Sequence, residues 1–184
     1  MNMDGRFTAK ELRSLGQKVL RLLLFENDID IFFGQQANFK PDIPQADIFE
    51  TAGTGKAFIT YDSRLFRAVN ESQYRRFLRD LQQVGRSPFH YLPEQNYVVT
   101  KLQVHYAPQI KFLAISWVAK QAKGKSVCLS SFKKLMCFAS NLSEMEEIPV
   151  IVGGTFHVPP EEIEENLPAG FDCHAYVPSN KRRQ

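Results

Sequence analysis

The sequence predicts a mixed α/β (α+β) fold in a single domain over residues 1–184. Stretches with the 3.6-residue period of a helix alternate with short runs of β-branched and aromatic residues, a pattern typical of layered α/β folds. With 43% hydrophobic residues, including 15 phenylalanines, the chain is able to bury one sizeable core. Residues 178–184 are a short basic tail, which we interpret as a solvated end.

The N-terminal part predicts a helix followed by a strand. Thr8 and Glu11 have the spacing of a capping box, and leucines then recur on one helical face, which predicts a helix over residues 9–26. A short apolar run over residues 29–33 predicts the first strand, and Gln36 follows near its carboxyl end.

A loop, a strand and a second helix are expected next. Residues 38–54 contain two prolines and Gly53, so we expect a loop there, and residues 55–61 predict a strand. Asn70 then has the position of a helix cap, with large apolar residues recurring behind it on one face. The other face carries Arg75, Arg76 and Arg79. We interpret it as a solvated face, with a phosphate-binding surface as the alternative.

The middle of the chain predicts a β-hairpin. Residues 97–105 and 111–117 alternate with the two-residue period of strands, and residues 106–109 between them have the composition of a turn. The two faces of the second strand are Phe112, Ala114 and Ser116 on one side and Leu113, Ile115 and Trp117 on the other. The two-residue period thus places Ser116 and Trp117 on opposite faces of the strand.

The remaining elements are a long helix, a strand, a short helix and a last strand. The long helix is expected to begin at Ser130, and a buried strand over residues 148–152 follows it. Residues 159–166 predict a short acidic helix, and residues 171–177 predict one more strand.

The strand at residues 148–152 leads into two glycines, for which we predict a tight turn with polar side chains beyond it. The sequence Gly153-Gly154-Thr155-Phe156-His157 resembles the GGDFN turn of the endonuclease/exonuclease/phosphatase superfamily, a family of magnesium-dependent phosphodiesterases. In that family the turn supplies an Asp and an Asn beside the scissile phosphate. The resemblance places Thr155 and His157 at these two positions.

Two further segments resemble strands of the same family. Residues 28–36 are similar to its "DILFLQE" strand, whose terminal Glu binds the metal, and the matching residue here is Gln36. Residues 114–118 are similar to an "SWH" strand end whose His contacts the phosphate, and Val118 stands at that position. The resemblance therefore implies that the carboxylates needed to hold magnesium are replaced.

The resemblance covers most of the chain and implies a two-sheet α/β/β/α sandwich. The family also has a first strand bearing an Asn and a final strand with an Asp-His pair, for which we find no counterpart. We therefore expect an incomplete domain, cut short at both ends.

Three functional hypotheses follow. The first is a catalytically impaired or inactive domain of this family, with a binding or scaffold role, or a domain fragment; it needs no cofactor. The second is a residual magnesium-dependent phosphodiesterase or nuclease that uses Glu50, Asp62 or Asp172. The third is a nucleic-acid-binding module with a surface made of Lys56 and the three arginines, although a net charge of +3 gives no global support for it.

Partners and location are also constrained. If end strands are missing, the strands at residues 29–33 and 148–152 have open edges, which predicts self-association or a protein partner. Three cysteines without CxxC spacing and no apolar signal region predict an intracellular protein, cytoplasmic or nuclear. The longest apolar run is too short to span a bilayer, so we expect no membrane association.

Overall fold

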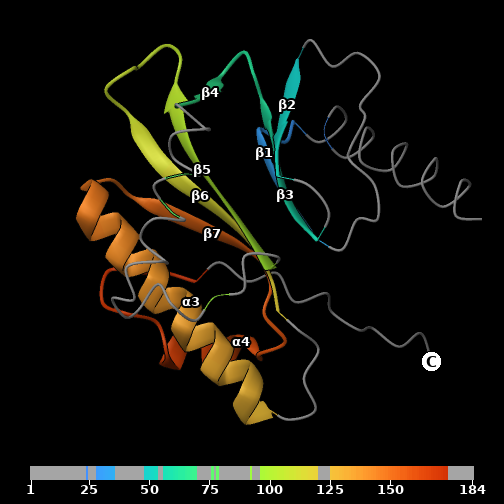
Figure 1. The fold of residues 1–184 in the computed structure, drawn as a ribbon, viewed down its shortest axis with the longest axis vertical. Helices are drawn as coiled ribbons and strands as arrows, with labels where there is room; N and C mark the ends of the chain where they lie inside the picture. Colours follow the sequence, from blue (N-terminus) through green and yellow to red (C-terminus); the bar gives the residue numbers. More distant parts are fainter. Residues whose placement is uncertain are drawn as a thin grey trace, which may run out of the picture.

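The computed structural model describes residues 24, 28–35, 48–53, 56–69, 76, 78, 92, 96–119 and 125–173. Its strands form two sheets that face each other, one of three strands and one of four. The helix α3 (Lys125–Glu146) covers the outer face of the four-stranded sheet (Figure 1). This arrangement confirms the predicted mixed α/β class and the two-sheet sandwich.

The three-stranded sheet has the order β1-β3-β2, and its pairs are antiparallel. β1 (Ile31–Gln35) lies two residues later than the predicted strand, and β3 (Ala57–Asp62) lies close to its predicted place. β2 (Phe49–Ala52) lies inside the segment for which we expected a loop, so that prediction is wrong. The hydroxyl oxygens of Thr51 and Thr60 lie 3.0 Å apart across β2 and β3, so partners in the sheet hold this short strand.

The four-stranded sheet has the order β4-β5-β6-β7. Its strands are β4 (Phe66–Ala68), β5 (Tyr97–Val104), β6 (Lys111–Val118) and β7 (Val150–Thr155). β5 and β6 confirm the predicted hairpin, whereas the three-residue β4 is too short to give a pattern and was not expected. β6 and β7 run parallel, and α3 lies in the crossover between them.

Two helices have bounds that can be compared with the sequence. α3 begins five residues before its predicted start at Ser130, and α4 (Pro160–Glu165) confirms the predicted acidic helix. The predicted helices at residues 9–26 and after Asn70 lie mostly outside the described residues. Residues 171–173 have no regular secondary structure, so the last predicted strand does not begin where expected; residues 174–177 lie outside the described part.

Side chains alternate along β6 between two layers of the core, as the sequence predicts. Leu113, Ile115 and Trp117 pack under α3, and Phe112 and Ala114 pack between the sheets. Because both faces of the strand are covered, seven of its eight residues are buried. β6 therefore contacts both α3 on one side and the three-stranded sheet on the other.

The predicted tight turn at Gly153 and Gly154 is wrong, because both glycines lie inside β7. A Cβ atom on Gly154 would lie 2.1 Å from the carbonyl oxygen of Trp117 in β6. A Cβ atom on Gly153 would lie 2.5 Å from the ring of Phe33 in β1. The two glycines therefore let β7 approach its neighbouring strand and the facing sheet.

β1 and β7 end their sheets within the described residues, where no strand pairs with their outer edges. The Ile151 side chain of β7 is 47% exposed. These are the two strands for which the sequence predicts open edges. In the same part of the chain, no helix combines the length and the apolar character needed to cross a membrane.

Candidate functional site

The carboxyl ends of β1, β6 and β7 meet at one end of the sandwich (Figure 1). The Ser116 hydroxyl of β6 is fully buried and donates a hydrogen bond to the carbonyl oxygen of Gly34 in β1, at 3.2 Å. Gln35, the last residue of β1, places its Nε2 atom 3.5 Å from the same hydroxyl. These contacts fix the end of β1 against β6, and this end of the sandwich is the candidate site.

Two of the residues singled out from the sequence lie side by side there. Val118 and Thr155 are directly opposite in the last pair of the β6–β7 ladder. The backbone nitrogen of Ala119 donates to the carbonyl oxygen of Thr155 at 2.9 Å, which continues the ladder by one bond. The structure thus brings together two positions that are 37 residues apart in the sequence.

His157 lies two residues beyond Thr155 and is exposed. Its backbone has a φ of 54°, in the left-handed region that residues other than glycine adopt less often. β7 has already ended at Thr155, and this conformation keeps the chain from continuing in the strand direction. Thr155 therefore ends β7 and His157 follows it, in the order that the resemblance implies, although no tight turn precedes them.

The structure describes only some of the other residues that the sequence singled out. Gln36, Arg75 and Arg79 lie outside the described residues, and Arg76 is an exposed residue of a helical segment. Lys56 is exposed and precedes Ala57, which pairs with Gln35 in the β1–β3 ladder. Of the predicted basic surface, Lys56 is the residue that the structure places at the candidate site.

The acidic residues of the second hypothesis lie elsewhere. Gln35 pairs with Ala57 at one end of β3, and Asp62 is at the other end, roughly 17 Å away at the rise of an extended strand. Glu50 pairs with Tyr61, one residue before Asp62, and the Tyr61 hydroxyl donates to its carboxylate at 2.5 Å. Neither carboxylate is near the end of β1.

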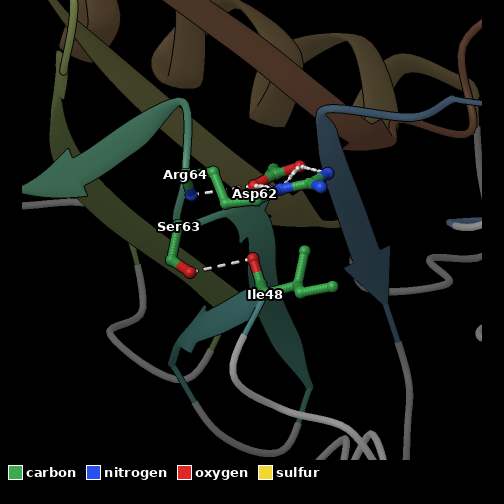
Figure 2. Close-up of polar contacts among 4 residues, drawn as sticks. All are labelled: Ile48, Asp62, Ser63 and Arg64. Carbon is green, nitrogen blue, oxygen red and sulfur yellow. Dashed lines mark hydrogen bonds and ion pairs between the residues drawn. The ribbon is translucent and has the colours of Figure 1, made fainter.

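Asp62 is engaged by its neighbour Arg64 (Figure 2). The Arg64 Nε atom lies 3.0 and 3.1 Å from the two carboxylate oxygens, and the Arg64 backbone nitrogen donates to one of them at 2.8 Å. Beside this pair, the Ser63 hydroxyl donates to the Ile48 carbonyl at 2.9 Å. The carboxylate of Asp62 thus stabilises the turn after β3.

The hydrogen bond from the Arg64 side chain holds the pKa of Asp62 below its ordinary value, although burial opposes this effect. Asp62 therefore stabilises the fold fully above an unfolded pKa of about 4. Between that value and the lower folded pKa, the unfolded chain binds more protons, so stability is lost as the pH falls.

Asp172 is exposed, and its neighbours Phe171 and Cys173 pack against the cluster formed by α3 and α4. Within the described ranges, no three His, Cys, Asp or Glu side chains are grouped so that they could hold a metal ion. The chemistry available at the described strand ends is therefore that of the Thr155 hydroxyl, the His157 imidazole and the Lys56 ammonium group, beside the apolar Val118.

Sequence reasoning missed the roles of Gln35 and Ser116, which join the two sheets at this site. A signal was present for Ser116, because the alternation along β6 places a lone hydroxyl on the same face as Phe112 and Ala114. A buried hydroxyl needs a partner, and that partner proved to be the backbone of the facing sheet.

Comparison with known proteins gives one kind of evidence, and it concerns the fold. No protein-family model matches the chain, and no curated protein matches it. Among solved structures, it is similar to the human Nocturnin catalytic domain with bound sulfate anion, with a TM-score of 0.58 and 13% sequence identity. The chain therefore shares the fold of that domain. The match covers 83% of this chain and 60% of the Nocturnin chain, so the chain spans less than two thirds of that neighbour's length.

Proposed function

We propose that this chain is a catalytically inactive endonuclease/exonuclease/phosphatase-like domain with a binding role. The observation that supports it is the set of side chains at the candidate site, where Val118 and Thr155 lie side by side and His157 follows. None of them is a carboxylate, which is the ligand that magnesium prefers in proteins. A hydroxyl and an imidazole provide hydrogen bonds, but not the negative charge that holds a hard cation.

The alternative of a residual phosphodiesterase needs other acids at this site. Glu50 and Asp62 are poor substitutes, because both lie near the far end of β3 and each already accepts hydrogen bonds. The nucleic-acid alternative has Lys56 as its support at the strand ends. We therefore favour the inactive domain over both.

We expect purified protein to hydrolyse a generic phosphodiester, plasmid DNA or abasic DNA no faster than buffer containing magnesium. The reason is that charge stabilisation by a bound metal is a large catalytic effect, and removing even one such contribution costs about 10²-fold or more in rate. The measurement is product release with magnesium and with chelator. Thr155→Asp should increase magnesium affinity, measured by calorimetry, without creating turnover.

Glu50→Gln is the control for the residual-enzyme alternative, because it removes the negative charge and keeps a carbonyl that accepts the Tyr61 hydrogen bond. A chelator-sensitive rate that this change abolishes would contradict the proposal. A chelator-sensitive rate that it leaves intact would also contradict it, and would move the search for ligands to Asp172 and Gln36.

The binding role has its best candidate surface at the edge of β7. Backbone groups on an edge strand pair readily with another strand, and natural edges often carry lysine to prevent this. We propose that a second copy of the chain pairs with this edge. Ile151→Lys should then weaken association about tenfold or more at any salt concentration, because strand pairing depends on backbone hydrogen bonds and apolar contact.

The measurement is light scattering after size exclusion across a concentration series. Met145→Lys is the matched control, since Met145 is 44% exposed on α3 and the change in charge is the same. A monomer at every concentration would contradict the edge pairing and leave the proposal of inactivity standing.

A further inference from the structure

Two consecutive stretches of the chain carry opposite charge. Residues 95–143 contain seven lysines and no acidic residue, whereas residues 144–173 contain eight acidic residues and no lysine or arginine. The net charge of +3 for the whole chain conceals this separation. A division of this kind along the sequence indicates two surfaces of opposite potential when each stretch folds into its own elements.

The basic stretch contains a groove on the outward face of α3. The groove has a volume of about 400 Å³. The described residues that line it are Ser126, Leu129, Ser130, Lys133, Lys134 and Cys137. Both lysines are exposed, and the helical period separates them from Phe132 and Leu135, which are buried beneath α3. The groove therefore combines two cations, two hydroxyls, one thiol and one apolar side chain.

The acidic stretch contains α4. Ile163 of α4 is buried in a cluster with Phe132 and Met136 of α3, which fixes the short helix beside the longer one. Its residues Glu161, Glu164 and Glu165 are exposed. By contrast, Glu146 at the end of α3 is bound by Lys101 at 2.5 Å. Because Ile163 faces the core, the glutamates on the other side of α4 form an exposed acidic surface.

We propose that the α3 groove of one copy binds the acidic α4 surface of a second copy. The argument for this occupant is charge complementarity within one sequence. This contact joins different surfaces of two identical chains, so it propagates from copy to copy. The inference does not rest on the proposed function, because it uses none of the side chains at the ends of β1, β6 and β7.

Salt dependence is the first test. Exposed ion pairs are individually weak and are screened by salt, so association should be present at about 50 mM salt and fall at least about tenfold at about 500 mM. Sedimentation velocity across a concentration series at both salt concentrations measures this directly.

Charge reversal is the second test. Lys133→Glu with Lys134→Glu, and separately Glu161→Lys with Glu164→Lys, should each weaken association at least about tenfold, because each variant then presents like charges. An equimolar mixture should associate again, since every contact between unlike variants pairs opposite charges. The chain with all four changes should also associate, which shows that the variants fold. Glu144→Lys with Glu147→Lys is the control of equal charge change and should behave like the unchanged protein.

Three results overturn the inference. One is a monomer at low salt at all concentrations. Another is association that depends neither on salt nor on the four charge reversals but is lost in Ile151→Lys, because such association would take place through the β7 edge. The third is a monomer that binds a single-stranded oligonucleotide with a steep salt dependence lost in the Lys133 and Lys134 variant, because the groove then serves a nucleic acid.

Discussion

Replacing Gly154 with alanine is expected to lower the free energy of unfolding by about 3 kcal/mol or more. The added Cβ would lie 2.1, 2.9 and 3.0 Å from the carbonyl oxygen, carbonyl carbon and nitrogen of Trp117. These are backbone atoms of a buried strand, so no side-chain rotation relieves the contact, and β7 has to move away from β6. Urea denaturation followed by tryptophan fluorescence measures the loss.

Gly170→Ala is the control for this change. Gly170 has a φ of 85°, and a Cβ there would meet nothing within 4 Å. Its cost should come from backbone conformation alone, about 1 kcal/mol. If both variants unfold at the same urea concentration, the close approach of β7 to β6 does not constrain the fold and our account of the paired glycines is wrong.

Replacing Phe138 with alanine is expected to cost about 3 to 5 kcal/mol of stability. Phe138 belongs to α3, and its side chain is fully buried between the helix and the sheet. Its ring centroid lies 5.3 Å from that of Tyr97 in β5. The change removes a large apolar surface and leaves a cavity between the helix and the sheet. Thermal and urea unfolding followed by circular dichroism measure it.

Met145→Ala on the same helix is the comparison, because Met145 is 44% exposed and the change should cost about 0.5 kcal/mol or less. A Phe138→Ala variant as stable as Met145→Ala would mean that α3 does not depend on this aromatic contact for its attachment to the sheet.

The elements that could be predicted from the sequence are those with a long periodic pattern. The patterns of β5, β6 and α3 each repeat over eight residues or more, and one face of each is mostly apolar. β2 and β4 have four and three residues, so no period can show. β2 and β4 form strands because each pairs with a neighbouring strand of its sheet. The residues that pair with β4 lie 34 to 38 positions away in the sequence.

The candidate site was predictable in part. The sequence led to Val118 and Thr155, which the structure places side by side at the ends of β6 and β7, but it could not show why two glycines occur there. Glycine is required there because a Cβ atom would collide with the carbonyl group of Trp117 or with the ring of Phe33, and both of these residues lie in other strands. Likewise, the distance of Glu50 and Asp62 from the end of β1 depends on the register of three strands, which no local pattern contains.

The hydrogen bond from Ser116 to Gly34 joins residues 82 apart in the sequence and connects the two sheets. Around it, the described residues between the sheets are mainly apolar. Apolar contact tolerates sliding, because one methyl group replaces another at little cost. A buried hydroxyl does not, since a shift of one residue leaves it without an acceptor at a cost of about 1 to 3 kcal/mol. The polar contacts of Ser116 therefore select one alignment of the sheets, whereas an interface of apolar side chains alone would accept many. The meeting of the three strand ends depends on that alignment.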